Sequence, residues 1–263
     1  MNYENIRLTV ASGVARLTLS RPDKLNSFTA VMHAEIRDAL ARVRIEPEAR
    51  VLLITGTGRA FSAGQDLADF AVPSNGATPD LSETVERDYA PLVRTLRDLP
   101  LPVLCAVNGV AAGAGANLAL ACDLVVAKES AAFLEPFCKL GLVPDTGGTY
   151  FLPRLIGTAR AMGLAMLGEK ISARQAADWG LIWKCVADAD FDAEVGALLA
   201  QLMSAPTLGL ARIKQAVYTS ADSTLEEQLL LERDLMRELG RTRDYREGVD
   251  AFLSKRTPEF HGR

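Results

Sequence analysis

The chain has 263 residues, of which 49% are hydrophobic and 24% charged, and its formal net charge is −4. This length and hydrophobic content suit one large domain that buries a full core, with room for a small C-terminal appendage, and they argue against a disordered chain. The negative net charge offers no electrostatic footprint for nucleic acid or for an anionic membrane surface, so we expect neither as a partner.

The N-terminal segment lacks a charged region followed by an apolar one, and no run of about 18 apolar residues occurs without a charge. We therefore expect neither export nor a membrane span. The four cysteines have no C-x-x-C spacing and lie mostly within apolar runs, which is typical of reduced, buried thiols. These features predict a cytoplasmic protein.

The first elements are a predicted hairpin and a helix. Residues 6–10 and 14–19 alternate apolar and polar side chains around a glycine-containing turn, which indicates two antiparallel strands. Ser27 or Thr29 is in place to cap a helix that continues to about Arg44.

Three near-continuous apolar runs follow, at 51–55, 103–107 and 123–127. Such runs are typical of parallel strands that are covered on both faces. Helical segments near 82–98 and 115–122 separate them, so the central part predicts a β-α-β-α arrangement with a mainly parallel sheet.

Two further segments have distinct composition. Residues 71–81 contain two prolines and a glycine and predict a loop that could cover a ligand. Beyond about residue 190 the strand signals vanish. Four leucines at helical spacing then predict an amphipathic helix with surplus apolar surface for another subunit, namely Leu225, Leu229, Leu235 and Leu239.

Two small-residue turns follow predicted strands, at 61–67 and within 105–123. Each turn exposes backbone N–H groups, and together they could stabilise one oxyanion. The alternative for the second turn is close helix–sheet packing. Leu118 stands where the third glycine of a dinucleotide fingerprint belongs, which argues against such a site, and no P-loop motif occurs.

Acid–base chemistry is predicted to rest on a carboxylate. His33 and His261 are the only histidines, we expect both at the surface, and they provide no Ser–His or Cys–His couple and no metal site. Asp145 has apolar neighbours that would raise its pKa, although an Asp before such a turn is also a common helix N-cap. Glu135 is expected as a solvated charge on a strand edge.

Four motifs in order resemble the crotonase (enoyl-CoA hydratase/isomerase) superfamily: residues 20–27, residues 61–67, residues 106–123 and residues 144–157. The resemblance implies an α/β fold, a spiral of β-β-α repeats over residues 1–190 with a C-terminal helical trimerisation region over 191–263. It implies a homotrimer or a dimer of trimers. It also implies acyl-CoA thioester substrates, no separate cofactor because CoA is part of the substrate, and enolate stabilisation by the N–H groups of Ala63 and Ala114.

The resemblance also bears on the reaction. Hydratases of the family carry two glutamates, and the matching positions here are Asn117 and Phe137, which cannot act as bases. Asp145 matches the aspartate of some family isomerases, and one carboxylate suffices for a 1,3-proton shift. This implies an acyl-CoA isomerase that moves a 3-enoyl double bond to the 2-position. A hydratase that uses Glu135 and a non-catalytic acyl-CoA-binding subunit remain as alternatives.

Residues 61–67, 144–148 and 244–256 further resemble family members that convert a ring epoxide of an aromatic acyl-CoA to an oxepin in phenylacetate breakdown. By the family pattern, Phe252 and Lys255 reach the CoA from a neighbouring subunit. The implied substrate- and CoA-binding set is Arg21, Lys24, Ala63, Gly64, Gln65, Asp66, Leu67, Gly113, Asn117, Phe137, Phe252 and Lys255.

Overall fold

The computed structural model describes residues 3–70 and 80–262, so most of the predicted loop at 71–81 lies outside the described residues. The predicted hairpin is confirmed by the antiparallel strands β1 (Ile6–Ala11) and β2 (Val14–Leu19). Of the two candidate caps, the Thr29 hydroxyl accepts a hydrogen bond from the Met32 N–H at 3.2 Å, so α1 (Ala30–Ile45) begins after Thr29.

The strands form two sheets, and successive repeats add their strands side by side. The larger sheet has the order β1-β2-β3-β5-β7-β10 and the smaller one β4-β6-β8-β9. The three predicted parallel strands are β3 (Val51–Gly56), β5 (Val103–Val107) and β7 (Leu124–Lys128), and each adds to the larger sheet in parallel. The larger sheet ends at β10 (Lys184–Val186).

After the N-terminal hairpin and α1, each repeat places one strand in each sheet and then a helix. The strands β4 (Ala60–Ser62), β6 (Val110–Ala112) and β8 (Ala132–Leu134) directly follow β3, β5 and β7 along the chain. The last strand of the smaller sheet, β9 (Lys170–Ser172), pairs antiparallel with β8. Crotonase-like β-β-α repeats, expected from the resemblance, are therefore confirmed.

The helices of the repeats differ in regularity. The predicted helix at 82–98 is α2 (Leu81–Thr84), a π-helical turn (Val85–Tyr89) and α3 (Ala90–Asp98). The next helices in order are α4 (Ala114–Leu120), α5 (Gly148–Leu167) and α6 (Ala173–Asp178).

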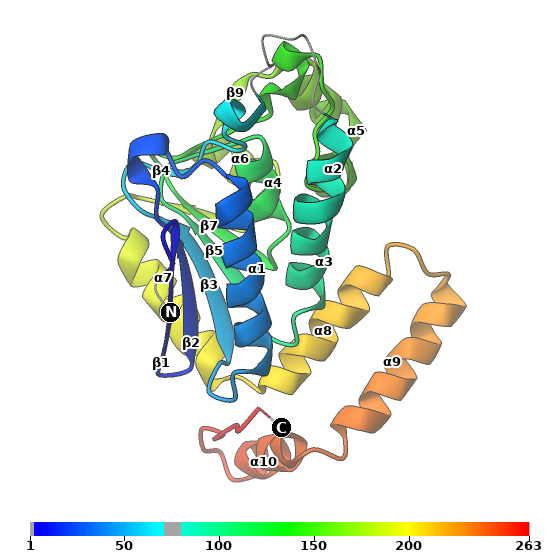
Figure 1. Ribbon diagram of the computed structural model, residues 1–263. Helices are drawn as coiled ribbons and strands as arrows, with labels where there is room; N and C mark the ends of the chain where they lie inside the picture. Colours follow the sequence, from blue (N-terminus) through cyan, green and yellow to red (C-terminus); the bar gives the residue numbers. More distant parts are fainter. Residues whose placement is uncertain (1–2, 71–79, 263) are drawn as a thin grey trace.

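The larger sheet is covered on both faces, as its apolar strands require. In β3, Leu52 and Ile54 face the core that contains α1 and α3, whereas Val51 and Leu53 face α7 (Phe191–Ser204). Figure 1 shows α1 and α3 on one side of the sheet and α7 on the other.

The C-terminal helices leave the body of the molecule. α8 (Thr207–Thr219) is held to it by Lys214, whose ammonium lies 2.9 Å from an Asp123 carboxylate oxygen and donates to the Leu96 carbonyl oxygen at 2.6 Å. α9 (Leu225–Leu239) and α10 (Arg243–Leu253) extend away from the sheets (Figure 1). The predicted boundary at residue 190, between the spiral and the helical region, stays a prediction. The helix that follows it, α7, packs on the larger sheet.

Candidate active site

The two small-residue turns meet at the start of α4. Gly64 has φ +85°, and a Cβ on it would lie 2.7 Å from the Ala112 carbonyl oxygen and 3.4 Å from the Ala114 nitrogen. Gly113 precedes α4 with φ +53°. Both positions favour glycine because side chains are disfavoured at such angles, and at Gly64 the neighbouring backbone also leaves no room for a Cβ. The predicted convergence of the turns is therefore confirmed.

The backbone donors differ from the prediction at one position. The Ala63 N–H donates to the Leu25 carbonyl at 2.9 Å, so it is not free for a substrate oxygen and its predicted role is wrong. Gln65, two residues later, lies opposite Phe28. The Phe28 N–H donates to the Gly64 carbonyl at 2.8 Å, and the Asp66 N–H donates to the Phe28 carbonyl at 2.9 Å. Within residues 3–70 and 80–262 no acceptor bonds the N–H groups of Gln65 and Ala114. These two groups form the pair available to an oxyanion.

Asp145 lies on a tight turn before α5. Its carboxylate oxygen Oδ1 accepts from the Thr146 hydroxyl at 2.9 Å, and its carbonyl accepts from the Gly148 N–H at 2.8 Å. Gly147 is the N-cap residue of α5, so the Asp145 side chain does not cap this helix. Burial raises the pKa of the Asp145 carboxyl and outweighs the opposing hydrogen bond from Thr146.

Asp145 and residues of both small-residue turns line one cavity of about 150 Å³. Asp145 is the one carboxylate among the described residues that line it. The remaining walls are mostly apolar and come from both turns, from the segment around the π-helical turn and from the loop after β8. The lining residues are Ala63, Gly64, Gln65, Leu67, Leu81, Thr84, Val85, Tyr89, Gly113, Ala114, Pro136, Phe137, Leu140, Leu142 and Asp145.

Glu135 and Asn117 lie behind the cavity rather than in its wall. The Asn117 side chain is fully buried on α4, and Glu135 is 3% exposed between β8 and a short 3-10 helix (Pro136–Leu140). The expectation of a solvated Glu135 is therefore wrong. Burial raises the pKa of the Glu135 carboxyl to about 8, helped by the charge of Asp145 and opposed by a hydrogen bond from Asn117.

An aromatic cluster that the sequence did not reveal supports Gln65. The Tyr89 hydroxyl donates to the Gln65 side-chain oxygen at 2.6 Å, and the Tyr89 ring packs edge-on against His33, with ring centroids 4.5 Å apart. His33 is 2% exposed, so its expected surface position is wrong, and burial lowers its pKa to about 4. His261 is exposed, as expected.

The predicted CoA-binding residues occupy two regions. Arg21 pairs with Asp66 at 3.1 Å, and Lys24 is exposed on the same segment, next to the turn that carries Gln65. Phe252 and Lys255 lie near the C-terminus and do not line this cavity. Phe252 is 82% exposed and lines a separate apolar cavity of about 790 Å³ between α8, α9 and α10.

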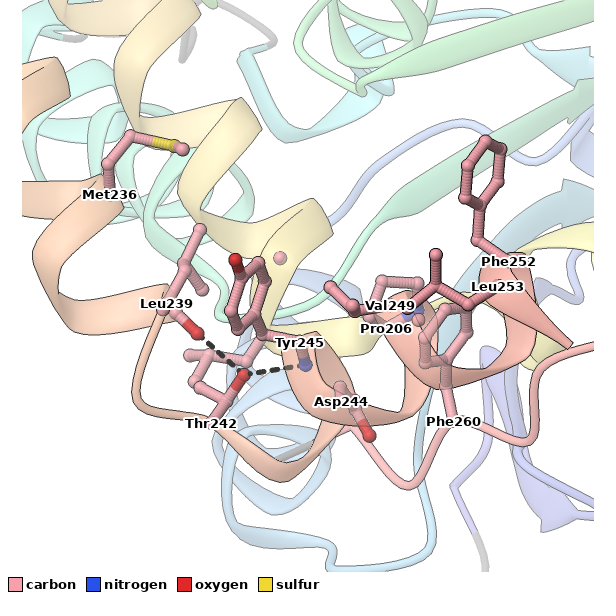
Figure 2. Close-up of a pocket in the computed structure, with 14 residues that line it drawn as sticks. Pro206, Met236, Leu239, Thr242, Asp244, Tyr245, Val249, Phe252, Leu253 and Phe260 are labelled. Carbon is pink, nitrogen blue, oxygen red and sulfur yellow. Dashed lines mark hydrogen bonds between the residues drawn. The ribbon is translucent and has the colours of Figure 1, made fainter.

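Figure 2 shows this second cavity. The Thr242 hydroxyl donates to the Leu239 carbonyl at 2.7 Å and accepts from the Tyr245 N–H at 3.1 Å, which fixes the corner between α9 and α10. The cavity wall presents the side chains of Met236, Val249 and Phe252 (Figure 2).

Neither membrane spans nor metal sites are found in the described part of the chain. No helix there is long and apolar enough to cross a bilayer. No three His, Cys, Asp or Glu side chains there gather as ligands for a metal ion.

Known proteins are similar to this chain over nearly its full length. The enoyl-CoA hydratase/isomerase family matches residues 9–263. The 1,2-epoxyphenylacetyl-CoA isomerase of Escherichia coli is 54% identical over 254 residues, which cover 97% of each chain. A Rhodobacter capsulatus protein named "Probable enoyl-CoA hydratase" is 49% identical over 265 residues and covers 100% of each chain. The solved enoyl-CoA hydratase from Bacillus anthracis superposes with a TM-score of 0.90 at 31% identity, covering 99% of this chain and 100% of that one.

Proposed function

The chain belongs to the enoyl-CoA hydratase/isomerase family, and from this premise we propose that it isomerises ring-1,2-epoxyphenylacetyl-CoA to oxepin-CoA. The observation that carries the proposal is a cavity in which Asp145 is the one carboxylate among the described lining residues, beside the two available N–H groups. The 54% identity to a 1,2-epoxyphenylacetyl-CoA isomerase supports the same substrate. A shift of a 3-enoyl-CoA double bond to the 2-position is a related reaction of the same groups.

In the proposed mechanism the thioester oxygen lies between the N–H groups of Gln65 and Ala114. The Asp145 carboxylate removes a proton from the carbon α to the thioester, and the N–H groups stabilise the enolate oxygen. With a 3-enoyl-CoA, the protonated Asp145 returns this proton to the γ carbon, so the double bond moves and no atom is gained or lost. With the epoxide, the ring expands to a seven-membered enol ether and the proton returns to a ring carbon.

The size of the cavity supports an aromatic acyl group. An apolar cavity of about 150 Å³ can hold a benzene ring, and the cavity that Asp145 lines is about 150 Å³. Its side walls include Val85, Phe137 and Leu142, which suit an uncharged ring. The raised pKa of Asp145 brings the carboxyl closer to neutral pH, where a proton-transferring group is most effective.

Hydration is the second candidate because a relative carries a hydratase name. A hydratase needs a group that activates water, and Glu135 is the candidate for this role. The Glu135 carboxyl does not line the cavity and bonds Asn117 instead, and burial raises its pKa. These observations favour isomerisation by Asp145.

We also propose how the whole substrate is held. Arg21 and Lys24 lie beside the turn that carries Gln65 and would bind the CoA phosphates. The exposed apolar surface of α9 and α10 supports a homotrimer, or a dimer of trimers, in which Phe252 and Lys255 approach the CoA of a neighbouring subunit. All four cysteines are free, which supports a cytoplasmic protein that acts in phenylacetate breakdown.

The first test incubates the purified protein with a 3-enoyl-CoA and follows the absorbance of the conjugated 2-enoyl-CoA, and a second assay uses the ring epoxide. We expect wild type to convert both and Asp145→Asn to convert neither. Equal conversion by Asp145→Asn would contradict the role of Asp145. Loss of a 2-enoyl-CoA absorbance when water adds, with sensitivity to Glu135→Gln rather than Asp145→Asn, would identify a hydratase.

A further inference from the structure

A buried polar pair connects the helix that carries the Ala114 N–H to the loop that carries Asp145. The Asn117 amide nitrogen Nδ2 donates to the Glu135 carboxyl oxygen Oε2 at 3.3 Å and to the Asp145 backbone carbonyl at 3.0 Å. Both amide hydrogens are therefore used. Asn117 lies one helical turn after Ala114, so the pair connects the two parts of the proposed catalytic machinery.

The other polar atom of this amide lacks a partner. The Asn117 oxygen Oδ1 is buried, and no donor bonds it among the residues that the structure describes. An ionised Glu135 carboxylate has no proton to donate to it. A protonated carboxyl carries one O–H donor, so the acid and the amide could then exchange two hydrogen bonds.

The surroundings of Glu135 favour the neutral form of its carboxyl. It faces a small space lined by apolar side chains of α4, β8 and α5, among them Ala116, Phe133 and Leu152. Of the charged groups in the described ranges, Asp145 is the one that acts on it, and Lys139 on the adjoining 3-10 helix is exposed to solvent. Burial and this like charge both raise the pKa of Glu135, to about 8.

We propose that Glu135 is a positioning residue that, as a neutral acid, pairs with the Asn117 amide and thereby fixes the Asp145 loop against α4. The inference rests on the proposed isomerase function. Glu135 itself does not touch the substrate, because it lies outside the cavity wall. Its effect passes through Asn117 to the Asp145 backbone.

The packing around Asn117 shows how little freedom the loop has. A Cβ on Gly148 would lie 2.5 Å from Asn117 Nδ2 and 2.8 Å from its Oδ1. The first residue of α5 is thus in direct contact with the amide. Ionisation of Glu135 removes the second hydrogen bond of the pair and places a negative charge near Asp145, so proton transfer should weaken at alkaline pH.

The test compares three proteins by kcat and KM for a 3-enoyl-CoA over a pH series: wild type, Glu135→Gln and Glu135→Leu. Gln keeps the neutral, two-bond pairing at every pH, whereas Leu removes it. We expect the wild-type kcat to fall with an inflection near pH 8, and the kcat of Glu135→Gln to lack this fall. Glu135→Leu should lose on the order of 10- to 100-fold in kcat with little change in KM, because a small displacement of a catalytic group is costly.

The matched control is Glu194→Gln on α7, where the carboxylate pairs with Lys184 at the surface. It should keep the wild-type pH profile. The proposal is overturned if Glu135→Gln retains the wild-type inflection, or if it loses as much kcat as Glu135→Leu. Should Glu135→Leu not fold, the pH profile of Glu135→Gln decides alone.

A second readout separates this inference from the proposed function. The side-chain amide of Asn117 can be followed by ¹⁵N NMR without substrate, and its signals should titrate near pH 8 in wild type but not in Glu135→Gln. An inactive wild type that shows this titration would refute the isomerase while the acid–amide pair stands. An active wild type without the titration would refute the pair alone.

Discussion

Replacing Glu135 by Gln should change how the stability of the protein depends on pH. The folded-state pKa of Glu135 is raised from 4.5 to about 8. Its carboxyl therefore keeps its proton in the folded chain over a range in which the unfolded chain has lost it. The contribution to stability is complete below pH 4.5 and is lost as the pH rises to about 8.

The size of this effect follows from the difference in pKa. Each unit corresponds to about 1.4 kcal/mol, so the loss over the range from pH 4.5 to about 8 is on the order of 5 kcal/mol. That is a large share of the stability of a typical domain, which is about 5 to 15 kcal/mol. The neutral Gln side chain has no such dependence.

Urea unfolding of wild type and Glu135→Gln at several pH values, at one protein concentration, measures the effect. The free energy of unfolding of Glu135→Gln minus that of wild type should increase by about 1.4 kcal/mol per pH unit between pH 5 and 8. Glu194→Gln, at the surface, should show no such increase relative to wild type. A difference that stays constant with pH would refute a buried neutral acid at position 135.

Three other predictions concern the site and the assembly. Asp145→Asn should lower kcat by about 10²- to 10⁴-fold while acyl-CoA binding, measured by calorimetry, persists; unchanged kcat would remove Asp145 from the reaction. Gly64→Ala should lower both the melting temperature and kcat because φ is +85° and the new Cβ would lie 2.7 Å from the Ala112 carbonyl oxygen, whereas Gly163→Ala, with nothing within 4 Å of its Cβ, should lower neither. If the proposed trimer forms, Phe252→Asp should shift the mass in analytical ultracentrifugation towards that of a monomer, because it puts a charge in an exposed apolar surface; an unchanged mass would place the interface elsewhere.

The sequence predicted the elements well where a local pattern determines them. The apolar runs of β3, β5 and β7 were recognisable because both faces of the sheet are covered. The failures arose from contacts between distant residues. The Ala63 N–H donates to the carbonyl of Leu25, 38 residues earlier, and no local pattern in the turn reveals this bond.

The buried polar residues show the same limit. His33 lies on a helix whose other face is exposed, and its burial depends on Phe28 and Tyr89, which come from different elements. Glu135 follows a strand and precedes Pro136, which is typical of an exposed edge. Its burial depends on α4 and α5 closing over it, and only the assembled repeats bring them there.

The use of backbone N–H groups as the candidate oxyanion donors has a consequence for how such an enzyme can change. Apart from substitution by proline, no mutation at Gln65 or Ala114 deletes its donor, so this part of the site tolerates sequence drift. The carboxylates are side chains and can be gained, lost or moved along the neighbouring loops one codon at a time. A scaffold of this kind can therefore acquire a new reaction on the same class of thioester while the N–H groups that bind the thioester oxygen stay in place.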